Sequence, residues 1–481
     1  MKGLKPILLI LFACFVSRIP MLTSPFMLLD GDECVVGLMA KHLYTGKALP
    51  LFFYGQRYGL SIIEELCILP FYLVFGVTAT AVKLAMLSLW TVGVVFTYKT
   101  LQLLNTKSKY APIILTLLLI VCPAWTEWSM KARGGYLTAF TLSAITTWLL
   151  CSKEKLSLGK YIIIGALLIL VYESMPLWLP AIALLFIYRL LKEYKSFKWL
   201  VVPVIFLTGY FGFAYYKQSL YQYHEPDKIL PINEWAHNLL RIPKFLYTSL
   251  HGYHYFFNPL QPGFFQQAFA MLFLALIVTV VVCSVIYAIK SKPFDWQLIT
   301  FTLPIIGSVL ITIITPDTNY RFLLPVTVSV LLLVQLLINR IEVLNKLVPV
   351  AGIMILLGIG SLITFRNFKF TIIREEPLHH FVDYLKARDI KYTFSCHVYL
   401  PWQVMFYSNE QVLSRDVSKE GRLPEYHRQI NDALRKGKKT AFIGLSNDYY
   451  GMNIQSPVYI DSIFVQEGLP ESELAKNFAF Q

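Results

Sequence analysis

The sequence predicts a mainly α-helical, polytopic membrane protein with a small C-terminal α/β domain on the extracytoplasmic side. Of the 481 residues, 56% are hydrophobic and 15% are charged, whereas a soluble domain is about 45–50% apolar and about 25% charged. Stretches that approach the roughly 20 apolar residues of a membrane-spanning helix recur up to about residue 365, after which the chain becomes polar. We therefore expect a transmembrane domain over residues 1–365 and a soluble domain over residues 366–481.

The expected membrane segments follow one another with short polar connections. One of them, 60–76, is short and carries Glu64, Glu65 and Pro70. It is either a spanning helix or a helix that lies in the membrane interface. The segments are 5–22, 60–76, 79–104, 110–127, 134–151, 159–173, 175–191, 198–216, 266–290, 297–315, 320–339 and 347–365.

The charge of the loops decides between these two alternatives. Short cytoplasmic loops collect Lys and Arg, and a spanning 60–76 would move all later basic loops to the other side. If 60–76 lies in the interface or re-enters, every basic loop is cytoplasmic. These loops are Lys2 to Lys5, Lys99 to Lys109, Lys153 to Lys160, Arg189 to Lys198, Lys290 to Lys292 and Arg340 to Lys346.

The resulting topology has about 11 to 13 transmembrane helices, with interfacial helices in the first outer loop. The N-terminus is cytoplasmic and the C-terminal domain extracytoplasmic, in the cell (inner or plasma) membrane. The first outer loop is 23–78 and the long outer loop is 217–264. Because the cytoplasmic loops account for most of the net charge of +14, little of it is left to mark a nucleic-acid site.

The tail has the patterns of a small α/β fold. Segments 376–389 and 425–436 have helical spacing, and 391–395 and 440–445 resemble strands. Segment 398–406 is strand or strand-helix material. The tail is large enough to fold by itself.

A cluster of acids, Asp30-Gly-Asp-Glu33, follows the first apolar segment. Apolar residues recur at helical spacing after it, so Asp32 and Glu33 belong to the first turn of an amphipathic helix on the membrane surface. One interpretation is purely structural, since acids are favoured at a helix N-terminus. The other is a general base or a metal-binding carboxylate at the membrane rim.

This region resembles the first extracytoplasmic loop of the GT-C glycosyltransferases. The resemblance consists of Asp32-Glu33, then Leu-Met-Ala-Lys-His-Leu-x-x-Gly over 38–46, a polar aromatic loop, and Leu-x-Phe-Gly over 73–76. The branch of the bacterial lipid A aminoarabinose transferase and the protein O-mannosyltransferases is the most similar. It implies a polytopic enzyme that uses a polyprenyl-phosphate-linked sugar, with Asp32 as the catalytic base, Glu33 beside it, and inversion at the sugar.

A second resemblance lies at 316–325, where Tyr320-Arg321-Phe-Leu-Leu-Pro325 is similar to a signature at the head of a late helix in the same superfamily. It implies that Arg321 lies near the lipid phosphate. With Arg57 and Arg133, which also fall on the outer side, Arg321 is predicted to bind the donor phosphate. The alternative for each is a solvated side chain at the membrane rim, which we favour for Lys131. The residues predicted to bind substrate are Asp30, Gln56, Tyr58, Tyr136 and Tyr320.

The chain departs from the family pattern at Gly135, where relatives often carry a second acid. Glu127, Glu64 or Glu173 could take its place. We expect Glu64 to take this place as a catalytic residue, because an acid inside an apolar membrane segment is costly and usually functional. The alternative is an interfacial carboxylate that faces water.

The nine histidines all fall on the outer side. Two of them, His251 and His254, have the spacing of a metal-ligand pair and could hold a divalent metal together with Asp32 or Glu64. A metal needs three or four ligands, so this pair alone is weak evidence. No other cofactor is indicated.

These features together predict an integral membrane glycosyltransferase. It would move a sugar from a polyprenyl-phosphate donor to an envelope glycan, glycolipid or protein acceptor on the extracytoplasmic face, with membrane lipids around it. One alternative is a transporter or flippase of lipid-linked glycans, which would place charges at the bilayer midplane. Another is a glycan polymerase or ligase.

Overall fold

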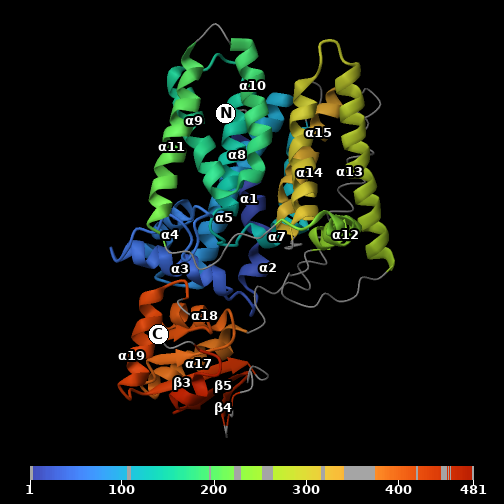
Figure 1. Cartoon of the computed structure of the whole chain (residues 1–481). Coiled ribbons are helices and arrows are strands. Elements are labelled where there is room, and N and C mark those ends of the chain that lie inside the picture. The colour runs from blue at the N-terminus through green and yellow to red at the C-terminus, as the bar shows by residue number, and fades with distance from the viewer. Residues whose placement is uncertain are drawn as a thin grey trace.

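A helical bundle and a small sheet domain lie one above the other in the computed structural model (Figure 1). The structure describes residues 4–105, 110–193, 197–220, 229–251, 264–315, 320–340, 374–418, 421–445, 452, 454 and 457–478. The predicted fold class is confirmed. The boundary predicted near 365 and the expected helix over 347–365 lie outside these residues.

The bundle is built from apolar helices that match the predicted segments. Five spans are long and apolar enough to cross a membrane among the described residues. Pro123 has no N–H to donate, and it separates the helices α6 and α7. The helices are α1 (Leu4–Val16), α2 (Ile19–Leu22), α5 (Ala79–Leu104), α6 (Ala111–Val121), α7 (Pro123–Trp128), α8 (Tyr136–Cys151), α9 (Leu158–Ser174), η1 (Pro176–Trp178), α10 (Leu179–Glu193), η2 (Phe197–Leu200), α11 (Val201–Gln218), α13 (Phe264–Lys290), α14 (Trp296–Ile314), η3 (Tyr320–Leu323) and α15 (Leu324–Arg340).

The first outer loop forms two helices, α3 (Gly31–Tyr44) and α4 (Ile62–Phe75), between the bundle and the tail (Figure 1). The 14 residues of α4 span about 21 Å, which is less than the roughly 30 Å of a bilayer core. The structure therefore supports the interfacial alternative for 60–76.

A further helix, α12 (Ile232–His251), lies at the same end of the bundle in Figure 1. The amide of Asn238 donates to the carbonyls of Ile313 and Thr315 at the end of α14, at 3.0 and 3.1 Å. This contact fixes α12 to the bundle. The sequence analysis placed this segment in the long outer loop 217–264 and predicted no helix in it.

The tail is a five-stranded sheet in the order β2-β1-β3-β5-β4. Strand β1 pairs in parallel with β2 and β3, and β3 and β4 both pair antiparallel with β5. In the β1–β3 pair, Phe394 lies opposite Phe442. The elements are α17 (Glu375–Ala387), β1 (Tyr392–Phe394), α18 (Leu400–Tyr407), β2 (Leu413–Arg415), α19 (Pro424–Arg435), β3 (Thr440–Leu445), β4 (Val458–Ile460), β5 (Ile463–Glu467) and α20 (Glu471–Leu474).

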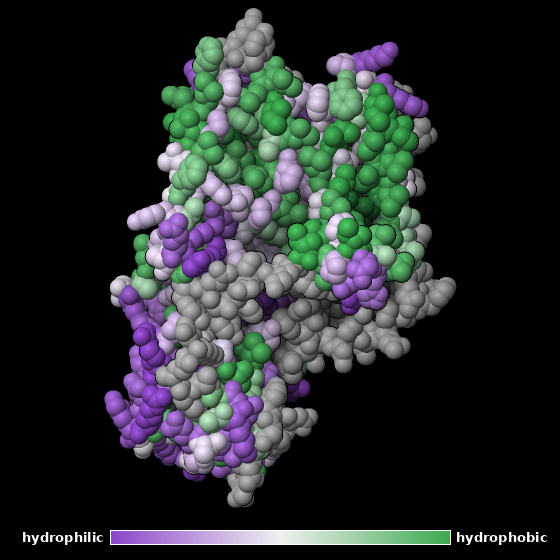
Figure 2. Space-filling model, in the orientation of Figure 1, coloured by the Kyte–Doolittle hydropathy of each residue, from purple (hydrophilic) through white to green (hydrophobic). Residues whose placement is uncertain are grey.

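Polarity divides the two layers, since the surface is mostly apolar over the bundle and mostly polar over the tail (Figure 2). This is the distribution expected if the bundle lies in lipid and the tail in water.

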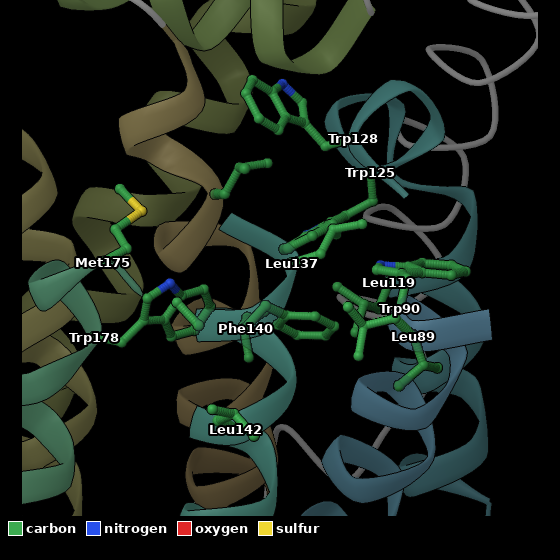
Figure 3. Close-up of a cluster of buried hydrophobic side chains, with 14 of the residues drawn as sticks. Leu89, Trp90, Leu119, Trp125, Trp128, Leu137, Phe140, Leu142, Met175 and Trp178 are labelled. Carbon is green, nitrogen blue, oxygen red and sulfur yellow. The ribbon is translucent and has the colours of Figure 1, made fainter. Parts of the chain in front are cut away.

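Aromatic side chains pack across the centre of the bundle (Figure 3). The ring centroids of Trp125 and Phe140 are 4.5 Å apart, and Phe140 reaches Trp178 at 5.8 Å. Gly93 permits this packing, because a Cβ there would lie 2.5 Å from the Phe140 ring. These rings support the loop between α7 and α8, which carries part of the candidate site.

The tail packs on α3 through two aromatic side chains. A Cβ on Gly31 would lie 2.4 Å from the Tyr399 ring, and one on Gly37 would lie 2.5 Å from the Phe406 ring. The backbone of Leu29 donates to the Tyr407 hydroxyl and accepts from the Gln403 amide, both at 2.9 Å. The domain is therefore placed directly on the helix that follows the acidic motif.

Candidate active site

The acidic motif forms the first turn of α3. Asp30 is the N-cap, and its carboxylate accepts the Glu33 N–H at 3.0 Å, while the Glu33 carboxylate accepts the Asp30 N–H at 3.1 Å. This reciprocal pair is a capping box, which satisfies two donors at the helix start. The contacts give Asp30 and Glu33 structural roles, while their predicted roles in substrate binding and catalysis stay predictions. Asp32 lies between them in the first turn of the helix.

Glu33 also fastens α3 to the bundle. Its carboxylate lies 2.6 Å from Nζ of Lys83, and neither side chain is accessible to solvent. Lys83 belongs to the 26-residue helix α5. Sequence reasoning missed it, although a lysine in an apolar helix is a recognised signal for a buried partner.

Arg133 bridges the two aspartates. One guanidinium nitrogen lies 2.6 Å from Oδ2 of Asp30 and another lies 2.5 Å from Oδ2 of Asp32. Lys131 lies 3.5 Å from Asp30 and 2.5 Å from Glu127. Burial raises the pKa of Asp30, but Arg133 and Lys131 outweigh it and hold that pKa below its ordinary value. Asp30 is therefore charged at neutral pH.

Glu64 holds the loop that carries Arg133. Its two carboxylate oxygens accept the backbone N–H groups of Arg133, Gly134 and Gly135 at 3.1, 2.9 and 2.8 Å. Burial raises the pKa of Glu64 to about 7, against the lowering effect of these three hydrogen bonds. The contacts support a positioning role, and the catalytic role of Glu64 stays a prediction.

The glycine at 135 has a structural reason. Its φ is +115°, a conformation that side chains rarely adopt, and a Cβ would lie 3.0 Å from the Ser174 carbonyl oxygen. An acid at this position is therefore incompatible with the loop. Of the other two candidates, Glu127 joins the cluster through Lys131, which also contacts Asp30, and Glu173 pairs with Lys217.

Asp32 is the most accessible acid of the cluster, with 22% of its side chain exposed. One oxygen contacts Arg133, and the other lies 3.2 Å from Arg422, which comes from the tail. Each carboxylate oxygen can accept two hydrogen bonds, and each has one arginine partner among these contacts. Each oxygen can therefore accept one further hydrogen bond. Sequence reasoning missed Arg422, because nothing in the sequence relates it to a residue 390 positions away.

Arg321 lies on the Tyr136 side of the site. Its guanidinium carbon is 5.5 Å from the centre of the Tyr136 ring, which packs on Trp128 at 5.0 Å. Because Tyr136 follows Arg133 by three residues, Arg321 and the acidic cluster are connected through the start of α8.

The remaining predicted residues are less closely joined to the acids. Arg57 is exposed and donates to the Leu220 carbonyl at 3.0 and 3.1 Å. Gln56 is half-buried and Tyr58 is exposed. The side chains of Tyr320 and His251, and the whole of His254, lie outside the described residues.

The described part of the site does not fit a divalent metal. No group of three His, Cys, Asp or Glu side chains suited to a metal ion occurs among the described residues. The carboxylates of Asp30 and Asp32 instead face Arg133, whereas a hard cation requires several free oxygen ligands.

An apolar groove of about 440 Å³ opens beside η3. It lies between α12, α13 and α14, and Leu323, two residues after Arg321, also lines it. Typical lining residues from these helices are Leu239, Ile277 and Val309. A groove with these walls suits a hydrocarbon chain.

Comparison with known proteins finds similarity in structure but not in sequence. No family model matches the chain, and no curated protein matches it in sequence. The chain is similar in structure to ArnT from Cupriavidus metallidurans, with a TM-score of 0.60 in the apo state and 0.62 bound to undecaprenyl phosphate. Identity is 10% and 11%, over 100% of this chain and 100% and 99% of ArnT.

The oligosaccharyltransferase of Archaeoglobus fulgidus in the apo form is also similar, with a TM-score of 0.54, 10% identity, and coverage of 93% of this chain and 70% of that one. The aminoarabinose transferase ArnT and this oligosaccharyltransferase both have the GT-C fold. The resemblance predicted from the first outer loop is therefore confirmed for the fold.

Proposed function

We propose that this protein is a membrane glycosyltransferase that transfers a sugar from a polyprenyl-phosphate donor to an acceptor hydroxyl, with Asp32 as the general base. The observation that carries the proposal is the position of Asp32, an accessible carboxylate at the membrane rim, held by Arg133 at 2.5 Å within a GT-C fold.

The proposed reaction is a single displacement at the anomeric carbon. Asp32 takes the proton of the acceptor hydroxyl while the acceptor oxygen forms a bond to C1 of the sugar. The bond between C1 and the phosphate oxygen breaks, and its electron pair leaves on polyprenyl phosphate. The attack comes from the face opposite the phosphate and inverts the configuration. The carboxylate also stabilises the positive charge that develops on the sugar.

The donor site is proposed at the junction of the apolar groove with Arg321. The polyprenyl tail would occupy the groove lined by Leu239, Ile277 and Val309, and the phosphate would meet Arg321 at its end. Guanidinium groups suit phosphate because they offer paired donors. ArnT, which shares the fold, has been solved bound to undecaprenyl phosphate. Arg133, which bridges Asp30 and Asp32, is also proposed to contact the donor phosphate.

The acceptor side is proposed to face the tail, outside the cell membrane. An envelope glycan, a glycolipid or a protein hydroxyl would approach Asp32 between α3 and the tail. The archaeal oligosaccharyltransferase has been solved tethered with an acceptor peptide. Gln56 and Tyr58 belong to the first outer loop, and we propose them for substrate contacts, whereas Arg57 between them is proposed for the donor phosphate.

A transporter is less well supported by the position of the charges. A transporter binds its substrate near the bilayer midplane. Here the described acids and cations of the cluster gather where α3, the start of α5 and the α7–α8 loop meet, at the tail end of the bundle.

The decisive experiment compares Asp32→Asn with the wild type in proteoliposomes. The donors are labelled undecaprenyl-phosphate hexoses and pentoses, and the acceptor is a total lipid and glycan extract. We expect transfer to fall by about 100-fold or more, because a general base contributes roughly 10²–10⁴.

The matched control is Asp383→Asn, an exposed aspartate of α17 in the tail, which should transfer at the wild-type rate. Binding of undecaprenyl phosphate to Asp32→Asn should stay within about twofold, because the variant keeps Arg133 and Arg321. Transfer by Asp32→Asn at the wild-type rate would refute the proposed role.

A further inference from the structure

We propose that Arg422, from the C-terminal domain, is a positioning residue that completes the site by fixing the Asp32 carboxylate. The tail would then be a working part of the enzyme, and the site would be incomplete without it. This inference rests on the proposed function of Asp32.

The Arg422 side chain makes three kinds of contact with the first outer loop. One guanidinium nitrogen lies 3.2 Å from Oδ1 of Asp32, and the other donates to the Tyr54 carbonyl at 3.4 Å. Its guanidinium carbon lies 4.8 Å from the centre of the Phe53 ring. Only 11% of the side chain is exposed. An arginine with carboxylate, carbonyl and ring partners loses most of its rotamer freedom, so its position is well defined.

The local backbone directs Arg422 toward the loop. Gly421 has a φ of +61°, and a Cβ on it would lie 2.3 Å from the His427 ring. Pro424 then begins α19 and fixes the chain direction. The turn at 421–423 is therefore pinned on both sides, which limits how far Arg422 can move from Asp32.

A second ionic cluster places the tail on α3. Glu410 lies 2.5 Å from Lys41 and 2.8 Å from His42, both in the last turn of α3. Tyr426 of α19 donates to Glu410, and the same ring lies under Lys47 at 4.5 Å. Since α3 also carries Asp32 in its first turn, one docked helix determines the distance between Asp32 and Arg422.

The consequence for Asp32 is a carboxylate held from both sides. Arg133 binds one oxygen from the bundle, and Arg422 binds the other from the tail. Two fixed cations prevent rotation of the carboxyl group about its last bond, and each oxygen keeps one acceptor position. A misplacement of about 1 Å in such a group costs about 100-fold in rate, so the effect of losing Arg422 should appear in kcat.

The kinetic test uses Arg422→Gln, Arg422→Lys and the control Arg428→Gln, an exposed arginine of α19. In the proteoliposome assay we expect Arg422→Gln to lower kcat by about 10-fold to 100-fold, with the donor KM within about twofold. Arg422→Lys should recover part of kcat, because it keeps the charge. Arg428→Gln should match the wild type. Unchanged kcat in Arg422→Gln, or a rise in donor KM alone, would overturn the proposal.

A second test does not depend on transfer. A double-mutant cycle in thermal unfolding combines Arg422→Gln with Asp32→Asn. If the two side chains interact in solution, the double variant should lose less Tm than the sum of the two single variants. Additive losses would overturn the Arg422 inference whatever the assay shows. Coupled losses with no transfer by the wild type would refute the proposed function and leave the contact standing.

Discussion

Helix α3 is anchored by two ionic clusters that differ in their exposure to water. On the bundle side, Glu33 meets Lys83, and both side chains are inaccessible. On the tail side, Glu410 and its partner Lys41 are 12% and 13% exposed, His42 is buried, and the cluster extends to Lys47, which is 44% exposed. A fully buried pair is costly to break by removing one partner, whereas a pair that water reaches is weaker and partly screened by salt. The helix is therefore held firmly to the bundle and more adjustably to the tail.

The largest effect is expected from Lys83→Met on the bundle side. The substitution leaves the Glu33 charge buried without its cation, so we expect a loss of about 3–5 kcal/mol in unfolding free energy. Thermal unfolding in detergent measures it. Lys99→Met in the same helix is the control, because Lys99 is half-buried beside Phe96 and should shift Tm little. A Tm equal to the wild type in Lys83→Met would show that the pair does not anchor α3.

The next effect is expected from Glu64→Gln, which acts on the loop beside α3. One glutamate oxygen accepts two backbone N–H groups, and the amide nitrogen that replaces an oxygen cannot accept. An unsatisfied buried donor costs about 1–3 kcal/mol, so Tm should fall. Glu65→Gln is the matched control, because its described hydrogen bond is one from the Ser61 hydroxyl, which the amide oxygen can still accept.

Glu64 also sets a pH dependence. Its folded pKa of about 7 lies above its ordinary value of 4.5. Its contribution to stability is therefore full below about pH 4.5 and is lost as the pH rises through about 7. The difference in Tm between wild type and Glu64→Gln should shrink over this range. A difference that grows with pH would show that the charged form is preferred.

The smallest effect is expected from Glu410→Gln on the tail side. We expect a loss of about 1–2 kcal/mol, because hydrogen bonds to two cationic partners are weakened at a site in contact with water. Faster hydrogen exchange in α18 would report it, and about 0.5 M salt should reduce the difference from wild type. Glu425→Gln, at an exposed glutamate 3.9 Å from Lys47, is the control.

The contribution of Glu410 to stability depends on pH with the opposite sign to that of Glu64. Burial raises the pKa of Glu410, but hydrogen bonds from His42, Lys41 and Tyr426 outweigh it and hold the pKa below 4.5. The contribution of Glu410 is therefore full above about pH 4.5 and is lost as the pH falls through its folded pKa. A protection factor of the α18 amides that falls down to about pH 3 in the wild type, but not in Glu410→Gln, would support this.

The sequence was most informative where local patterns decide the structure. Apolar runs predicted the membrane helices, and the acids before Val36 predicted the first turn of α3. The helices α17 and α19 and the strand Thr440–Leu445 were also predicted, whereas 398–406, interpreted as strand or strand-helix material, forms the helix α18. These features depend on neighbours a few residues away, which a single sequence displays.

The arrangement of the candidate site depends on tertiary contacts, which a single sequence does not display. Arg422 reaches Asp32 through the docking of the tail, and Glu64 has its partners in a loop about 70 residues later. The predicted phosphate ligand Arg133 lies on the carboxylates, because the bend at Gly134 and Gly135 turns the loop toward α3. The hydrophobic periodicity of a sequence does not specify contacts between residues that are far apart in the chain. Lys83 and Glu64 are nevertheless recognisable as charged residues in apolar helices.

The placement of Gly31 and Gly37 under the rings of Tyr399 and Phe406 has a consequence for biosynthesis. The ribosome makes α3 early and residues 399–422 much later. In the growing chain, Gly31 and Gly37 therefore lack their contacts with Tyr399 and Phe406 until the tail has folded. During that interval the newly made protein has Asp32 and Arg133 but no Arg422. If Arg422 positions Asp32 as proposed, the site is complete only after the tail has folded.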